Sequence, residues 1–486
     1  MTREFDMVDN EKIVVRRFTS PVGVQVFVDW DRDGYFDGAW EDLTDLVGEV
    51  FTERGESAEF GTVAVGQADI QLYDKEHAWS LFREQPVPGF GPGAGVFIQA
   101  LAGGVIRPLF HGYVERVAFS HRPEEPTAII LTAHDLLGKL RDVNVKLETM
   151  VDTNTPSVLD AVLDAAGIPE SQRDIDIESD PITIVWGDEK SAYQWLRDLA
   201  TAFGYTFFVR KDGVLAVRGR GFHTPRQVQF VLTGIESASY DYSLEEAVTD
   251  VEIIGKPLRV ESTVSVVWQI LEQFILNPNE ERFVEALFAS PAYNVQTPVA
   301  GTDYTAQDDA GNDRTSYLSV YMFPSKSRSA VLLLRNTYFG PLTVTKLQLR
   351  GQKVIELDKI KRTVENVRAR ALLGRRERRI EAEWIQQLSV LDGIASYWGN
   401  RLERPPIGLE LVYLSSLWGS LPTDVLEAEL GDVVVVPLPT GDLLGLVSAV
   451  RTAFSQEEVA VRLQVDRIGA WNLFTFYLRD VWDSIA

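Results

Sequence analysis

Residues 190–218, KSAYQWLRDLATAFGYTFFVRKDGVLAVR, predict one helix followed by one hairpin, and we interpret this unit as the centre of the chain. Ser191 occupies a helix N-cap position, and Gln194, three residues later, completes a capping box. The apolar side chains recur at helical spacing on one face: Ala192, Trp195, Leu196, Leu199, Ala200 and Phe203. Gly204 ends the helix, where a left-handed residue is favoured. Two strand-like runs joined by Lys211-Asp212-Gly213 complete a compact α/β unit without a catalytic motif.

The composition limits the classes of protein to which this chain can belong. Its 486 residues suffice for about three domains, and a hydrophobic content of 45% is normal for a globular protein. A net charge of −24 argues against binding to nucleic acid or to an anionic membrane surface. The absence of cysteine excludes disulfides and thiolate chemistry. We expect a chain made in the cytoplasm without membrane insertion, since it has neither a signal-peptide core nor an apolar run of roughly 18 residues.

Short strands and turns flank the α/β unit on both sides. Residues 1–150 contain many short alternating runs separated by Gly, Pro, Asp and Asn, as in an antiparallel barrel or sandwich. Residues 151–226 form the α/β module, whose first helix begins at Thr155-Pro156. Similar strand patterns return in 227–261 and 353–470, and a helix is predicted over 381–402. The intervening residues 262–352 differ in character and are predicted to be an inserted β-sandwich.

An acidic run lies near the start of the first β-region. Asp29, Asp31 and Asp33 alternate and are followed by Gly34, which resembles the first half of a calcium loop, with Asp37 as a further ligand. The twelfth position is Trp40 rather than Glu, and Glu41 comes one residue late. The alternative is an acidic hairpin turn in which Asp and Gly supply the turn chemistry.

No enzyme site is predicted. None of the five histidines has the spacing of a zinc site, and no carboxylate pair is distinguished by its spacing among 71 acidic residues. The histidines are His77, His111, His121, His134 and His223.

Two further segments suggest contacts. Residues 358–379 contain nine Lys and Arg against three acidic residues, and favour an electrostatic seam with an acidic neighbour over a nucleic-acid site, because no aromatic residues accompany them. Residues 471–486 are rich in aromatic side chains. They are interpreted either as a docking segment for a neighbour or as a segment folded back on its own domain.

The order of these segments resembles the tail hub proteins of long-tailed bacteriophages, also called baseplate hub or minor tail proteins. The residues that carry the resemblance are 28–34, 42–47, 107–114, 130–135, 191–218, 301–304, 347–351 and 430–435. The resemblance implies two hub-type β-barrels, 1–150 and 227–261 with 353–470, flanking the α/β module. It also implies a homotrimer whose pseudo-sixfold ring joins the sixfold tail tube to the threefold tip.

In such a hub the ring surrounds the channel for DNA and the tape-measure protein. The resemblance implies the virion tail tip as location, with the distal tail or tail tube protein, the tape-measure protein and tail-tip or fibre proteins as partners. DNA is then present only in transit. The alternative hypothesis is a host-attachment protein that binds a cell-surface glycan through the inserted β-sandwich, although a sandwich fold alone does not imply sugar binding.

Overall fold

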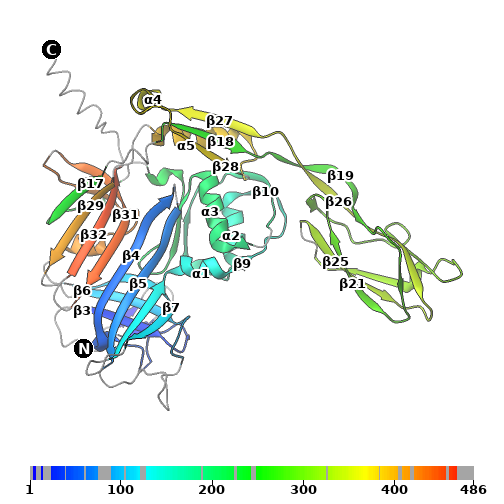
Figure 1. Ribbon diagram of the computed structural model, residues 1–486, viewed down its shortest axis with the longest axis horizontal. Helices are drawn as coiled ribbons and strands as arrows, with labels where there is room; N and C mark the ends of the chain where they lie inside the picture. Colours follow the sequence, from blue (N-terminus) through cyan, green and yellow to red (C-terminus); the bar gives the residue numbers. More distant parts are fainter. Residues whose placement is uncertain are drawn as a thin grey trace.

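The computed structural model describes residues 4–6, 12–14, 23–38, 40–59, 62–74, 89–102, 105–120, 127–187, 190–223, 227–241, 248–324, 327–382, 384–402, 408–415, 421–439, 441–455 and 459–467. Strands dominate these residues, and six α-helices accompany them. Figure 1 shows a broad β-rich body from which a narrow arm extends to one side. The predicted β-rich multidomain class is confirmed. Within the described residues, every helix is too short or too polar to cross a membrane.

One sheet of 15 strands organises the body, and both ends of the chain contribute to it. Its main path runs β17-β29-β32-β31-β4-β5-β8-β7-β6-β3. The N-terminal strands are β3 (Gly23–Asp29), β4 (Val47–Glu59), β5 (Thr62–Asp74), β6 (Gly95–Ala102), β7 (Val105–Ser120) and β8 (Thr127–His134). The later strands are β16 (Phe230–Val231), β17 (Ser237–Asp241), β29 (Gly408–Ser415), β30 (Val433–Val436), β31 (Leu443–Phe454) and β32 (Val459–Arg467). A separate short hairpin joins β1 (Glu4–Asp6) and β2 (Lys12–Val14).

Strands β4 and β31 join the N-terminal and C-terminal parts of this sheet. They pair antiparallel, and Thr52 lies opposite Thr452, 400 residues away. One hydrophobic core serves both parts, with Ile70 and Leu131 in the same cluster as Leu411 and Val461. The prediction of two barrels is not confirmed, because no sheet formed by the described strands closes into a barrel. The alternation of apolar residues indicates which face of a strand is buried, but it does not specify which strand pairs at each edge.

The α/β module packs beside this sheet. It contains α1 (Leu136–Asp142), α2 (Thr155–Ala165), α3 (Ala192–Phe203), β11 (Arg173–Asp176), β14 (Thr206–Val209) and β15 (Leu215–Arg218), with β10 (Met150–Asn154) paired to β12 (Pro181–Val185) and β9 (Asn144–Val145) to β13 (Lys190–Ser191). The predicted N-cap and C-terminal glycine of α3 are confirmed: Ser191 Oγ accepts from Gln194 N at 3.2 Å, and Gly204 has φ 72°. The Gln194 side chain, which is expected to complete a capping box, instead donates to Asp198 Oδ1 at 2.6 Å. β14 pairs with β15 and touches β5, so the predicted hairpin continues the large sheet.

A second layer, formed by residues from the C-terminal half of the chain, covers α3. A three-stranded sheet of β18 (Asp250–Gly255), β27 (Ile360–Glu365) and β28 (Glu377–Ala382) packs with α4 (Val367–Leu373) and α5 (Leu388–Leu402) above the module (Figure 1). Trp384 contacts Trp195 of α3, with ring centroids 5.2 Å apart. The predicted helix over 381–402 is too long, since α5 begins only at Leu388 and Glu381 belongs to a strand. The apolar spacing of Trp384 and Ile385 reflects packing just before the helix.

The arm, residues 258–356, begins as a two-stranded ribbon of β19 (Leu258–Gln269) and β26 (Leu342–Glu356). Its root is held by a small apolar cluster in which Leu258 and Val354 meet Ile184 of β12. Further out it carries β20 (Phe274–Leu276), β22 (Ala292–Tyr293) and β23 (Tyr304–Gln307), all paired with β26. A separate sheet in the order β21-β25-β24 contains β21 (Glu281–Leu287), β25 (Ser329–Asn336) and β24 (Leu318–Met322). The distal arm has its own core, built around Leu332, Leu334 and Leu347.

Candidate functional site

The acidic loop after β3 folds back on the strand from which it starts. Asp29 lies at the end of β3 and accepts from the backbone N–H groups of Asp33 at 3.2 Å and Gly34 at 3.0 Å. Glu41 accepts from Gly38 N at 2.6 Å. The backbone of the returning segment then pairs with β3, since Val28 N donates to Glu41 O at 2.9 Å. The loop is therefore a closed turn whose two ends lie side by side.

This closure brings three carboxyl groups together. Oxygen atoms of Asp29, Asp31 and Glu41 all lie within 4.8 Å of one another, and they form the only such group among the described residues. Asp29 and Glu41 are almost fully buried, whereas Asp31 is exposed. Burial raises the pKa of Asp29, and burial together with the neighbouring charges of Asp31 and Asp29 raises the pKa of Glu41. A hard cation with oxygen ligands suits such a group, because it would neutralise the mutual repulsion.

The structure changes the set of candidate calcium ligands. Asp29 and Asp31 belong to the converging group, but Asp33 and Asp37 do not. The Asp33 carboxylate instead accepts from Tyr35 N at 2.8 Å, which is an ordinary turn contact. Glu41 joins the group instead. The spacing of a calcium loop does not select Glu41, because that pattern assumes a continuous loop, whereas this loop closes against a strand. Calcium binding by this loop stays a prediction.

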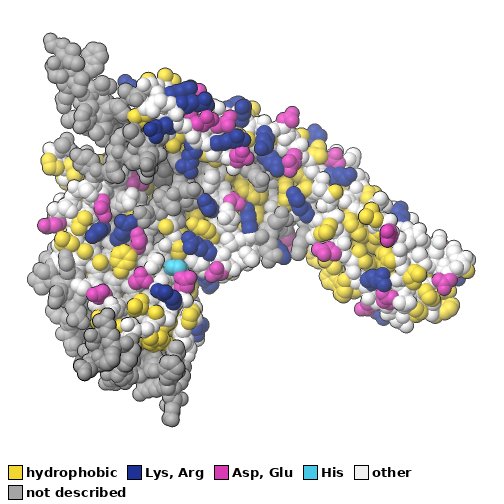
Figure 2. All heavy atoms as spheres, viewed as in Figure 1, with side chains coloured by type: hydrophobic (Ala, Val, Ile, Leu, Met, Phe, Trp, Pro, Cys, Tyr) yellow, Lys and Arg dark blue, Asp and Glu magenta, His cyan; other side chains and the backbone are white. Residues whose placement is uncertain are grey.

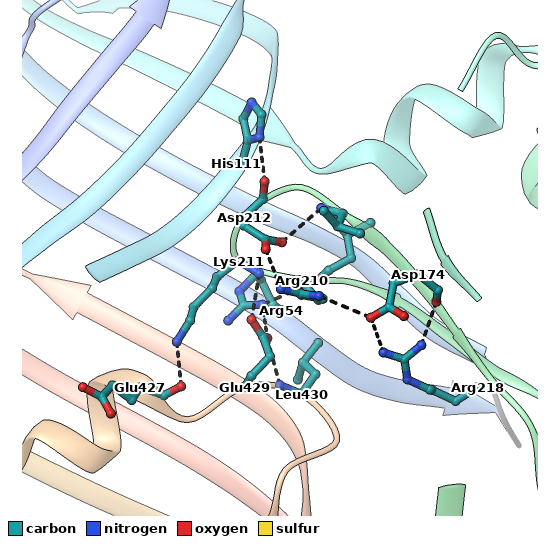
Figure 3. A network of polar contacts seen from close by, with 12 residues as sticks. Arg54, His111, Asp174, Arg210, Lys211, Asp212, Arg218, Glu427, Glu429 and Leu430 are labelled. Atoms are coloured by element: carbon teal, nitrogen blue, oxygen red, sulfur yellow. Dashed lines mark hydrogen bonds and ion pairs between the residues drawn. The ribbon is translucent and has the colours of Figure 1, made fainter. Parts of the chain in front are cut away.

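A buried ion pair lies where three parts of the chain meet (Figure 3). Arg54 of β4 and Glu429, just before β30, form an ion pair with Nη1 and Oε1 2.6 Å apart. The other Glu429 oxygen accepts from the backbone N–H of Lys211, in the hairpin of the α/β module, at 2.9 Å. Burial alone would raise the pKa of Glu429, but the charges of Arg54 and Lys211 outweigh it and hold the pKa below its usual value.

The hairpin tip makes further contacts around this pair. Lys211 Nζ donates to the backbone oxygen of Glu427 at 2.6 Å, and burial lowers the pKa of this lysine. His111 of β7 contacts the backbone oxygen of Asp212 at 3.1 Å. Arg107, also of β7, pairs with Glu427 at 2.8 Å. The tip of the module is thus fastened both to the N-terminal strands and to the segment before β30, as Figure 3 shows. No sequence motif identifies this junction.

The basic segment 358–379 finds acidic partners within the chain. Lys361 of β27 and Arg379 of β28 lie on either side of Glu252 in the central strand β18, at 3.5 and 3.9 Å. Arg362 pairs with Asp392 of α5 at 2.6 Å. Figure 2 shows the Lys and Arg side chains gathered with acidic ones along the edge that carries these strands. These basic residues therefore pair with acidic side chains of the same chain, and the predicted seam with an acidic neighbour stays a prediction.

The remaining candidate residues show ordinary contacts or lie outside the described part. His134 contacts Glu115 at 2.6 Å and His111 contacts a backbone oxygen, so each has a local partner. His77 and His121 lie outside the described residues, as does the C-terminal segment 471–486. None of the described histidines belongs to a group of side chains arranged to hold a metal.

Comparison with known proteins rests on structure alone. No protein-family model and no curated protein matches the sequence. Among solved structures, the 43 kDa tail protein of prophage MuSo2 from Shewanella oneidensis matches with a TM-score of 0.50 and 12% identity, over 92% of this chain and 98% of that chain. The tail protein from Neisseria meningitidis MC58 matches with a TM-score of 0.51 and 11% identity, over 93% and 98%.

These two matches define the class of fold. Each covers nearly the whole of a tail protein and more than nine-tenths of this chain. The chain has the fold of phage and prophage tail proteins, as the resemblance in its sequence indicated. At 11–12% identity the likeness concerns the fold, and it carries no individual residue across.

Proposed function

We propose that this chain is a structural, non-enzymatic subunit of a phage tail or a related injection particle, and that it forms the hub. In this role three copies make a ring that joins the sixfold tail tube to the threefold tip. The observation that carries the proposal is the fold shared with two tail proteins over 98% of their length. The partners are then the tail tube or distal tail protein, the tape-measure protein and tail-tip or fibre proteins.

The construction of the body supports this role. Because β4 pairs with β31, the first and last β-regions share one sheet and one hydrophobic core. Glu429, which is paired with Arg54, also accepts from the backbone N–H of Lys211 and so links the α/β module to the same sheet. A subunit whose two ends are joined in one sheet suits a ring that has to keep its shape while DNA passes. The net charge of −24 suits a channel lining, since an acidic surface repels DNA instead of retaining it.

We also propose a division of labour along the chain. Residues 1–150 and the later segments 227–261 and 353–470 supply the two hub regions, 151–226 link them, and 262–352 project as an inserted unit. The separate core of the distal arm supports this division.

The native mass of the purified chain tests the proposal. We expect a mass near three times 54.4 kDa, measured by light scattering coupled to size exclusion. A chain that stays at 54.4 kDa up to high concentration, and also after addition of its tail-tube partner, contradicts the hub assignment.

A further inference from the structure

The sheet β21-β25-β24 of the arm carries large apolar side chains on both faces. Its inner face packs into the arm core through Ala286, Leu332 and Leu334. In an antiparallel sheet with one buried face, the alternate residues on the other face are normally polar. Here the outer positions are mixed: Glu281, Glu285, Ser319, Ser329 and Arg335 are polar or charged, but six others carry large apolar side chains, namely Phe283, Leu287, Tyr321, Phe323, Val331 and Leu333. We call these six residues the outer face of the arm.

The outer face is exposed to solvent. Phe283 and Leu287 are each 66% exposed, and Tyr321 is 57% exposed. The strand register places these side chains next to one another, because Phe283 and Tyr321 both lie opposite Leu333. Phe323 contacts both rings, at centroid distances of 6.2 Å to Phe283 and 5.0 Å to Tyr321. Among the described residues, nothing covers this patch.

Exposed apolar residues are concentrated on the arm. Of the 23 exposed large hydrophobic residues in the described part of the chain, 12 lie within 258–356. Figure 2 shows hydrophobic side chains gathered over the arm, at a distance from the body. A monomeric soluble protein rarely exposes a contiguous patch of this kind without a partner.

The charge of the arm differs from that of the body. Residues 258–356 contain nine Lys and Arg and ten Asp and Glu, a net charge of −1, so the rest of the chain carries −23. Two copies of the body therefore repel each other, whereas two arms meet almost without electrostatic cost. The arm also extends away from the body (Figure 1), where it can reach a neighbouring copy.

We propose that the outer face of the arm is a contact between copies of this chain. The inference rests on the proposed hub, and it names the surface that helps hold the ring together. A neighbouring copy packed against the outer face would bury these aromatic side chains. The near-neutral arms then supply association energy that offsets repulsion between the acidic bodies.

A glycan fits this face less well. Sugar sites combine an aromatic platform with several polar groups that bind hydroxyls. Beside the outer face, on the same side of the sheet, Glu281 and Arg335 lie opposite each other and are engaged as an ion pair at 3.6 Å. The aromatic cluster is therefore better suited to apolar protein side chains.

Thiol accessibility tests the contact directly, because the chain contains no cysteine. A Val331→Cys variant places one thiol on the outer face, and Leu271→Cys places one on an arm turn that is 96% exposed. In the trimeric fraction, we expect maleimide to modify Val331→Cys at least about tenfold more slowly than Leu271→Cys. In a second measurement, Phe283→Ser should raise the concentration at which trimers dissociate by about tenfold or more, and Leu271→Ser should not.

The outcomes separate this inference from the hub assignment. Trimers in which Val331→Cys reacts as fast as Leu271→Cys overturn the arm contact and leave the hub assignment intact. A chain that stays monomeric at every concentration, and also after addition of its tail-tube partner, overturns both. If cell-wall oligosaccharides protect Val331→Cys in the absence of association, the outer face is a glycan site and the proposed contact is wrong.

Discussion

Arg54 and Glu429 form a buried ion pair between two segments that are 375 residues apart in the sequence. Their atoms Nη1 and Oε1 are 2.6 Å apart, and the Arg54 side chain is only 4% exposed. The same carboxylate accepts from the backbone of Lys211. This single glutamate therefore ties together the N-terminal strands, the α/β module and the segment that leads into β30.

Replacing Glu429 should destabilise the chain strongly. In Glu429→Ala, Arg54 stays buried without its counter-ion, which costs about 3–5 kcal/mol. Urea unfolding followed by tryptophan fluorescence measures the loss. Glu377→Ala is the control, because its pair with Arg375 is exposed and should contribute less than about 1 kcal/mol. Equal losses in the two variants would show that the buried pair has no special role.

The same pair should make stability depend on pH. The pKa of Glu429 is lower in the folded chain than its ordinary value of 4.5. Ionised Glu429 therefore contributes its full stabilisation to the folded state above pH 4.5. This stabilisation is lost as the pH falls through the folded pKa. We therefore expect the difference in unfolding free energy between wild type and Glu429→Gln to shrink from pH 6 towards pH 3. A difference that is constant over this range contradicts the assignment.

The acidic loop yields a prediction about calcium. If Asp29, Asp31 and Glu41 hold a cation, Ca²⁺ stabilises the folded state, by about 2.7 kcal/mol at a concentration 100 times Kd. We expect millimolar Ca²⁺ to raise the Tm of the wild type and of Asp37→Asn, whose carboxyl group lies outside the cluster. The rise should disappear in Glu41→Gln. A response that is lost in Asp37→Asn and kept in Glu41→Gln would support the ligand set of the sequence pattern instead.

The caps of α3 should contribute measurably to stability. Ser191→Ala removes the hydroxyl that accepts from Gln194 N and should cost about 1 kcal/mol. Gly204→Ala should cost at least as much, because φ is +72° and the new Cβ would lie 2.8 Å from the Tyr397 ring. Gly393→Ala in α5 meets nothing within 4 Å and should instead stabilise by about 0.5–1 kcal/mol. Thermal unfolding of the three variants checks these signs.

Individual helices and strands could be predicted from the sequence, because the interactions that form them join residues that are close in the chain. The helix over 192–203, with Ser191 at its start and Gly204 at its end, depends on contacts between residues a few positions apart. The alternating strands followed for the same reason. In the acidic loop, Asp29 and Asp31 were recognised from their spacing, whereas Glu41 joins them only because the loop closes against β3.

The tertiary structure alone decided how these elements are joined. The pairing of Thr52 with Thr452, and of Arg54 with Glu429, brings together residues that are far apart in sequence, and alternation within a strand cannot specify a distant partner. For this reason, one continuous sheet replaces the two expected barrels. The outer face of the arm is likewise decided by tertiary packing. Strand β21 has apolar residues at both of its alternating sets of positions, and only packing decides which set is buried in the core and which faces solvent.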